Sequence, residues 1–203
     1  MLNGQLPPQS IIEKINMEVV KVSADGAGLH LHPDYIVGDM DSTNFSDRDN
    51  KYHKISDQTT TDFEKCLNFV QKKKLYPTLV LAIAGGEIDH AINNFMIFMS
   101  TSYPLYFLDY AQILKLGIAV RVSIRLQLPE YSIVTILPFF SATVSTKGLD
   151  WELCNTKLRY NGLRSARNKN MTKNIEINVH EGQVLVIAEV KNFSVLKNIK
   201  VKK

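Results

Sequence analysis

The chain is poor in cysteine and tryptophan, and it has no long apolar run. Its 203 residues include two cysteines, Cys66 and Cys154, and no C-x-x-C pair, which excludes a disulfide framework and a cysteine-based metal site. Its apolar stretches, such as Thr78–Ala84 and Phe95–Met99, are much shorter than the roughly 20 residues of a membrane span. Residues 1–5 have neither the basic nor the apolar region of a secretory signal. We therefore expect a cytoplasmic protein with no membrane partner.

Charge is divided unequally along the chain. The sequence is 45% hydrophobic and 22% charged, which is enough apolar material for a core. Residues 1–113 carry 9 Lys/Arg and 14 Asp/Glu, whereas residues 114–203 carry 15 and 6. A basic half is typical of some nucleic-acid-binding proteins, but this half has no RRM, KH or helix-turn-helix signature and no aromatic stacking platform among its arginines. We expect no nucleic-acid partner, and the split indicates two parts with different functions.

In the first half, short apolar runs alternate with helical periods. A helix is expected to begin at Thr61, the N-cap of an S/T-x-x-E capping box, and a second helix is expected farther along. Strands that alternate with helices indicate a mainly parallel α/β sheet. The expected strands are Glu18–Ser23, Tyr35–Val37 and Thr78–Ala84, and the expected helices are Asp62–Lys74 and about Asp89–Met99.

The second half changes to a period of two. Between Val120 and Leu128, apolar residues alternate with polar ones, as in a strand with one exposed face. Lys191–Lys203 fits a last strand or a frayed tail. The expected fold is α/β plus all-β, with a mainly parallel α/β domain over residues 1–116 and a small β-sandwich over 117–203. Further strands are expected at Ser132–Leu137, Ile175–Val179 and Val184–Val190.

Acidic residues follow the expected strands of the first half. Asp39 and Asp41 come directly after the strand that ends at Val37, and Asp62 stands at the start of a helix. In α/β sheets, ligands bind at the carboxyl ends of the strands, and Mg²⁺ prefers a few carboxylate oxygens together with substrate phosphates. Each pattern taken alone also fits an ordinary Asx turn or the favourable start of a helix. Both readings are open for any single motif.

Glycine turns follow two other strands. Gly85 and Gly86 come after the most apolar strand and before Asp89, and Asp25 lies within a glycine-rich turn. Glycines at such places allow backbone N–H groups to approach a phosphate at a helix N-terminus, although no Walker A lysine follows here. Because four acidic or glycine turns occur at successive strand ends, the sequence favours a shared functional site over independent turns.

Six segments, in this order, resemble the thiamine pyrophosphokinase family. Their order and spacing are specific, and they extend over nearly the whole chain. The segments are Ala-Asp-Gly-Ala (24–27), Gly-Asp-Met-Asp-Ser (38–42), Asp-Gln-x-x-Thr-Asp-x-x-Lys-Cys (57–66), Gly-Gly-x-x-Asp-His (85–90), Thr-x-Gly-Leu-x-Trp-x-Leu (146–153) and, in part, Ser-Ala-Arg-Asn (165–168).

The resemblance implies an ATP:thiamine diphosphotransferase that uses Mg²⁺ and gives thiamine diphosphate and AMP. It also implies a homodimer whose active sites lie between the subunits. By motif, it assigns the catalytic roles to Asp39, Asp41, Asp62 and Asp89, the first three of which would hold Mg²⁺. It further places Asp25, Gln58, Gly85 and Gly86 on the nucleotide side, and Trp151, Ser165 and Asn168 at the thiamine pocket.

Three positions depart from the family pattern. Glu87 stands where the family commonly has an arginine, Thr59 where an acidic residue is frequent, and Arg167 where the family has a small serine. A missing cation beside a phosphate site could be supplied by another basic residue, and Lys65, Arg164 and Arg167 are the candidates. Two alternatives to the enzyme remain: a non-catalytic relative that binds thiamine or a nucleotide, and a diphosphotransferase with a different acceptor.

Overall fold

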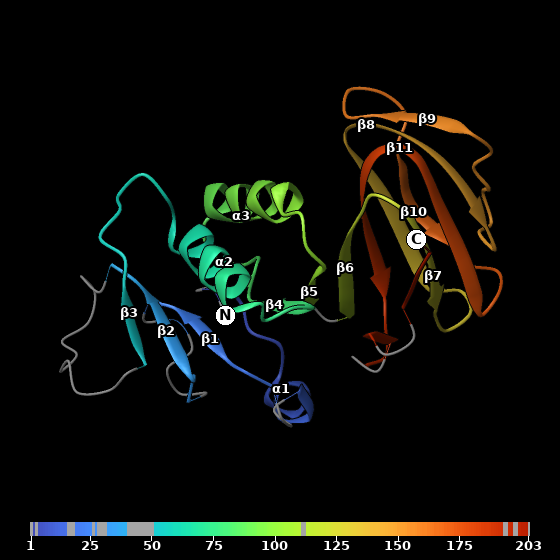
Figure 1. Ribbon diagram of the computed structural model, residues 1–203. Helices are drawn as coiled ribbons and strands as arrows, with labels where there is room; N and C mark the ends of the chain where they lie inside the picture. The colour runs from blue at the N-terminus through green and yellow to red at the C-terminus, as the bar shows by residue number, and fades with distance from the viewer. Residues whose placement is uncertain are drawn as a thin grey trace. The chain divides into compact units, whose positions relative to one another are not determined.

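The chain folds into two compact units, residues 1–109 and residues 110–203 (Figure 1). The structure is a computed structural model, and it describes residues 2, 4–15, 19–25, 27, 32–39, 51–110, 113–192, 195–196 and 199–202. Within these ranges, no helix has both the length and the apolar character that crossing a membrane requires. The expected domain bounds of 1–116 and 117–203 stay a prediction, and strand β6 (Leu114–Val120) spans residue 116.

The first unit is a parallel α/β structure. Strands β1, β2 and β3 form one parallel sheet in that order, and β4 pairs with β5 in parallel. The expectation of a mainly parallel sheet is therefore confirmed. The elements of this unit are α1 (Gln9–Ile15), β1 (Val22–Ala24), β2 (Tyr35–Gly38), β3 (Tyr52–Lys54), α2 (Asp62–Lys73), β4 (Thr78–Leu81), α3 (Ile88–Ser100) and β5 (Leu105–Tyr110).

Helix α2 begins where its sequence predicts. The side chain of Thr61 accepts a hydrogen bond from the backbone N–H of Glu64, and the Glu64 carboxylate accepts one from the backbone N–H of Thr61, which completes the capping box. One face of the helix is buried and includes Phe63 and Val70. The helix packs on β1 and β2 and lies beside α3 (Figure 1). This packing places the first turn of α2 near Asp39, which directly follows β2.

The second unit is the expected β-sandwich. Its strands are antiparallel, and β8 and β11 pair along most of their length. Residues 184–189 of β11 pair with β6, whereas residues 174–177 pair with β7. The two halves of the long strands therefore belong to different layers. Besides β6, the strands are β7 (Ser123–Gln127), β8 (Ile133–Lys147), β9 (Thr156–Arg159), β10 (Ser165–Lys169), β11 (Asn174–Glu189) and β12 (Lys200–Lys202).

The crossing between layers corrects two sequence predictions. The expected strands Ile175–Val179 and Val184–Val190 belong to one strand, β11, which continues past Gly182 through two register shifts in its pairing with β8. Conversely, the expected strand over Val120–Leu128 is interrupted by a bend, and Val122 is 43% exposed. The interruption follows from the topology, because β6 and β7 pair with opposite ends of β11 and so cannot form one straight strand.

One expected strand is shorter than predicted, and for the end of the chain the structure decides between two interpretations. The strand expected over Glu18–Ser23 begins only at Val22 and ends at Ala24, and residues 16–18 lie outside the described ranges. The lysine-rich end of the chain contains a short last strand, β12, which pairs with β7. Of the two interpretations of that segment, the structure therefore supports the strand for residues 200–202.

Candidate active site

Two of the predicted carboxylates approach the same buried cation. Asp39 directly follows β2, and Asp62 is the first residue of α2. The Nζ atom of Lys65 lies 3.0 Å from Oδ1 of Asp62 and 3.7 Å from Oδ2 of Asp39. The side chain of Lys65 is only 3% exposed. The end of a strand and the start of a helix are thus joined by one ammonium group, and the two carboxylates face a common point.

The charge of Lys65 is held by its acidic neighbours. Burial by itself lowers the pKa of a lysine. Here the hydrogen bond to Asp62 and the negative charges of Asp62, Asp39 and Asp57 outweigh burial and raise the pKa of Lys65 above its usual value. The cluster therefore places a buried cation between two carboxylates.

The loop before α2 adds polar groups to this cluster. Gln58 donates a hydrogen bond from Nε2 to Oδ2 of Asp39 at 3.2 Å. Asp57 accepts hydrogen bonds from the side chain and the backbone N–H of Thr59 and from the hydroxyl of Thr60, at 2.7 to 2.9 Å. These bonds lower the pKa of Asp57 to about 2. Thr59, which departs from the family pattern, is therefore the residue that organises a neighbouring carboxylate.

Asp25 lies at the neighbouring strand end. It follows β1, is 5% exposed, and has a positive φ of 41°. Its backbone N–H donates to the carbonyl of Val37 at 2.8 Å, and a Cβ at Gly38 would lie 2.9 Å from the Cβ of Asp25. Only glycine fits at position 38 without a shift, so the glycine before Asp39 allows the ends of β1 and β2 to approach closely.

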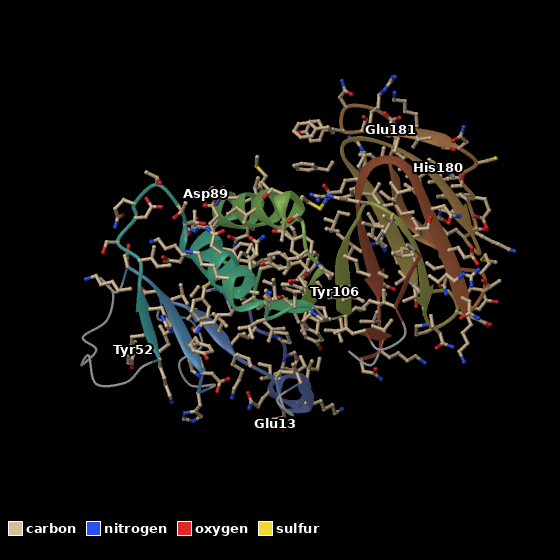
Figure 2. All side chains as sticks on the ribbon, in the orientation of Figure 1. Glu13, Tyr52, Asp89, Tyr106, His180 and Glu181 are labelled. Atoms are coloured by element: carbon tan, nitrogen blue, oxygen red, sulfur yellow. The ribbon has the colours of Figure 1, made fainter. Side chains whose placement is uncertain are left out.

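The glycine turn after β4 leads into α3. Gly85 and Gly86 have φ values of 94° and 77°, which side chains rarely adopt. A Cβ at Gly85 would lie 2.6 Å from the backbone nitrogen of Gln5, whereas no atom of the described residues lies within 4 Å of a Cβ at Gly86. Asp89 stands in the first turn of α3, where its Oδ1 accepts from the backbone N–H of His90 at 2.8 Å (Figure 2). Among the described residues, the space beside Gly86 is therefore not filled by another part of the chain.

The carboxylate oxygens of this cluster are the type of ligand that Mg²⁺ prefers. Asp39 and Asp62 offer carboxylate oxygens that face one cation, and such oxygens are the protein ligands that Mg²⁺ prefers. Asp41, the third residue expected to hold the ion, lies outside the described residues. Among the residues that the structure does describe, no group of three or more His, Cys, Asp and Glu could hold a metal ion. The assignment of the metal to these aspartates stays a prediction.

The second unit brings together the three residues assigned to thiamine. Asn168 donates from Nδ2 to the backbone carbonyl of Trp151 at 2.7 Å, and its Oδ1 accepts from the Trp151 backbone N–H at 3.1 Å. Nδ2 also lies 3.4 Å from Oγ of Ser165. The side chain of Asn168 is 1% exposed, whereas Trp151 is 69% exposed. The indole is thus open to a ligand, and both polar atoms of the asparagine are used on the backbone that carries it.

Sequence reasoning gave two residues less weight than their contacts justify. Lys65 was only one of three candidate cations, because nothing in the motif indicates that its ammonium lies between Asp39 and Asp62. Glu152 occupies a variable position of the tryptophan motif, so the motif gives no reason to single it out. Its carboxylate nevertheless accepts three hydrogen bonds. A signal for Glu152 was present only in the spacing that places a long acidic side chain after a glycine turn.

Two family models match the chain. Residues 13–106 match the thiamin pyrophosphokinase catalytic domain, and residues 121–184 match the thiamin pyrophosphokinase vitamin B1 binding domain. Among curated proteins, thiamine pyrophosphokinase 1 of Arabidopsis thaliana is 32% identical over 158 residues, which are 67% of this chain and 58% of that protein. Thiamine pyrophosphokinase 1 of Oryza sativa subsp. japonica is 28% identical over 169 residues, 71% of this chain and 61% of that protein. The chain spans about three fifths of the length of these relatives.

Solved structures share the fold at low sequence identity. A thiamin pyrophosphokinase from Geobacillus thermodenitrificans superposes with a TM-score of 0.76 at 16% identity, covering 96% of this chain and 97% of that chain. The yeast enzyme gives a TM-score of 0.69 at 19% identity, covering 93% and 84%. The two domain models, matched in tandem over more than half of the sequence, place the chain in one family. The chain belongs to the thiamin pyrophosphokinase family.

Proposed function

We propose that the chain is an ATP:thiamine diphosphotransferase, which moves a diphosphate group from ATP to the hydroxyethyl oxygen of thiamine and releases AMP. The observation that carries the proposal is the tandem match of a catalytic domain and a vitamin B1 binding domain. Each unit also holds groups that suit its share of the reaction. The first has two carboxylates around a cation, and the second has an exposed indole.

The carboxylate cluster supports a role in binding ATP with Mg²⁺. Asp39 and Asp62, together with Asp41, would hold the ion, and Asp89 would lie close to the substrates. When bound there, Mg²⁺ supplies positive charge that offsets the negative charge of the diphosphate in transfer. Phosphoryl-type transfer depends on positioning and charge neutralisation more than on covalent chemistry, so a rigid set of oxygens is what it requires. The nucleotide side would be formed by Asp25, Gln58, Gly85 and Gly86.

Lys65 is the residue to which we assign the charge that the family commonly takes from an arginine at position 87. Glu87 is exposed and makes no side-chain cap on α3. Lys65 lies within 4 Å of both carboxylates and keeps its charge at neutral pH, because its pKa is raised. Arg164, another candidate, donates its hydrogen bond to the carbonyl of Tyr160 in the second unit.

The exposed indole of Trp151 supports binding of the acceptor. Thiamine carries a positive charge and flat rings, and both favour the face of a tryptophan, with a free energy of about 0.5–2 kcal/mol for the cation–π part. The indole is 69% exposed, so its face is accessible to such a ring. We therefore assign Trp151 to one wall of the thiamine pocket, with Ser165 beside it.

An endpoint assay tests this function. Purified protein is incubated with Mg²⁺, ATP and thiamine, and AMP, ADP and the thiamine phosphates are resolved by chromatography. Thiamine diphosphate that appears in step with AMP supports diphosphate transfer, and Asp39→Asn should then abolish it while circular dichroism shows an unchanged fold. Thiamine binding without AMP would instead favour the non-catalytic relative. AMP release with only another alcohol would favour a different acceptor.

We also propose that the chain acts as a homodimer whose active sites take residues from both subunits. Asp39→Asn would be inactive alone, and Trp151→Ala would lose most of its activity when thiamine is well below its KM. After the two variants are unfolded together and refolded, half of the dimers carry one of each, and about a quarter of the wild-type activity should return. No recovery from a mixture shown to be dimeric would place both residues of a site in one subunit. A cytoplasmic location stays a prediction.

A further inference from the structure

The loop that carries Trp151 is bonded tightly to its surroundings although its indole is exposed. Its backbone N–H and carbonyl both bond to the side chain of Asn168, as described above. Asp150 donates its backbone N–H to the carbonyl of Lys169 at 2.8 Å, and Met171 donates to the carbonyl of Gly148 at 2.8 Å. Leu149 is 4% exposed and anchors the loop in the core. These contacts tie the loop to the end of β10 and to Met171, which follows that strand.

Glu152 closes the same loop from the other side. Its Oε1 accepts the backbone N–H groups of Gly148 and Leu149, at 2.5 and 3.1 Å, and its Oε2 accepts the hydroxyl of Thr146 at 2.6 Å. The Thr146 hydroxyl in turn accepts the backbone N–H of Leu153 at 2.8 Å. The carboxylate next to Trp151 in the sequence therefore joins the beginning of the loop to its end.

The glycine at the start of the loop makes this closure possible. Gly148 has a φ of 93°, which turns its N–H toward the same oxygen that Leu149 reaches. A Cβ at this position would lie 2.6 Å from Oγ1 of Thr172 and 2.9 Å from the carbonyl of Asn174. Two adjacent N–H groups and a hydroxyl thus surround one carboxylate, which is a favourable arrangement for an anionic acceptor. We expect a side chain shorter by one methylene group to lose at least one of these three hydrogen bonds.

We propose that Glu152 is a positioning residue for the acceptor, acting on thiamine through the orientation of Trp151. This inference rests on the proposed function, because it takes the indole to be a wall of the thiamine pocket. The carboxylate already accepts three hydrogen bonds within its own loop, so its role is to hold the loop in one conformation. Loss of these bonds leaves the exposed indole on a loop that is closed on one side only, and the pocket wall becomes less ordered.

The proposal differs from a simple electrostatic attraction between Glu152 and cationic thiamine, and two substitutions separate the two explanations. Glu152→Gln removes the charge but keeps an oxygen for both N–H groups, and its amide can donate to Thr146. Glu152→Asp keeps the charge but shortens the side chain by one methylene group. Positioning predicts that Gln preserves function and Asp does not, whereas attraction predicts the opposite. Glu181→Gln is the matched control, at an exposed residue in the bend of β11 (Figure 2).

The first readout requires no ligand. Trp151 is the only tryptophan of the chain, so time-resolved fluorescence anisotropy of the protein alone reports the motion of this loop. We expect Glu152→Asp and Glu152→Ala to increase the amplitude of the fast nanosecond decay, and Glu152→Gln and Glu181→Gln to leave it unchanged. Thermal melting monitored by circular dichroism ensures that each variant is folded. Unchanged anisotropy in folded Glu152→Asp would overturn the proposal.

The second readout is the kinetics of the acceptor. We expect Glu152→Asp to raise the KM for thiamine about three- to tenfold. This range corresponds to the free energy of one hydrogen bond to a charged group that water can partly replace. The kcat and the KM for ATP should change less than twofold, because the carboxylate cluster is untouched. An increased loop motion with no change in the KM for thiamine would also overturn the proposal. If the wild-type protein has no transferase activity, the proposed function fails, but the anisotropy test of the loop is unaffected.

Discussion

At the scale of single residues, the most informative contact is the buried ammonium group of Lys65 between two carboxylates. Removing the ammonium group leaves the negative charges of Asp39 and Asp62 without compensation, so the two carboxylates would repel each other. We expect Lys65→Met to lower the free energy of unfolding by about 1–2 kcal/mol, a discounted value since Asp62 is 38% exposed. Urea unfolding measures this, with the exposed Lys72→Met as the control.

The same variant provides a test of the metal site without catalysis. If Asp39 and Asp62 bind Mg²⁺, the ion should restore part of the stability that Lys65→Met loses, because it binds only the folded state. The melting temperature of Lys65→Met should therefore rise more with millimolar Mg²⁺ than that of the wild type. An equal response in both proteins would argue against a metal between these two carboxylates.

Asp57 gives the chain a pH-dependent contribution to stability. Its pKa is lowered from 3.8 to about 2 by hydrogen bonds from Thr59, with Thr60 adding a further one. Because the pKa of Asp57 is lower in the folded protein than in the unfolded chain, the ionised carboxylate stabilises the folded state. This contribution to stability is fully present above about pH 4, near the pKa of the unfolded chain, and is lost as the pH falls toward 2. Carbon-detected NMR should give a titration midpoint near 2 for Asp57. In Thr59→Val the midpoint should move toward 3.8, and an unmoved midpoint would contradict the assignment to Thr59.

At the scale of elements, the start of α2 is fixed by a local motif. Thr61 and Glu64 satisfy each other's backbone N–H groups, and Thr61→Ala removes one half of this arrangement. We expect a loss of about 1 kcal/mol in the free energy of unfolding, while Thr61→Ser stays close to the wild type. Denaturant titration of the three proteins measures the difference. Equal stability of Thr61→Ala and Thr61→Ser would show that the cap contributes nothing.

The crossing of β11 between the layers depends on Gly182. Its φ is 79°, and a Cβ there would lie 2.2 Å from the carbonyl oxygen of Ser141 in β8. Both the conformation and the space therefore exclude a side chain. We expect Gly182→Ala to cost about 3 kcal/mol or more, since backbone strain of 1–3 kcal/mol is added to a steric clash. Gly162→Ala, where the nearest atom lies 3.4 Å away, is the control, and equal melting of the two variants would contradict this account.

Prediction from sequence succeeded for elements that local chemistry defines. The boundaries of α2 follow from its capping box and apolar face, and both are visible in adjacent residues. It failed where the pairing of distant segments determines the strand boundaries. Residues 175–190 contain Gly182, which is typical of a turn. Because β8 pairs with the residues on both sides of this glycine, they form the single bent strand β11. Val120–Leu128 shows one unbroken alternation of apolar and polar residues. In the structure, however, β6 and β7 pair with opposite ends of β11, so the segment is divided between two strands.

At the scale of the whole molecule, two probes report on different units. The helices α1, α2 and α3 all lie in residues 1–109, whereas Trp151 lies in residues 110–203. Each unit has its own buried core, so we expect the loss of helical circular dichroism and the change in tryptophan fluorescence to occur at different denaturant concentrations. Coincident transitions over a range of protein concentrations would mean that the two units unfold as one cooperative system.

The amino-acid sequence was sufficient to predict the family and the fold class. These features depend on residue type and on spacing along the chain, which a linear pattern contains. The three-dimensional structure was needed to show that Lys65 lies between Asp39 and Asp62, that Asn168 bonds to the backbone of Trp151, and that Glu152 closes its loop. These hydrogen bonds and ion pairs depend on the local backbone conformation, as in the turn at Gly148, and on where distant segments meet, as for Asn168 and Trp151, and the spacing of residues along the chain specifies neither.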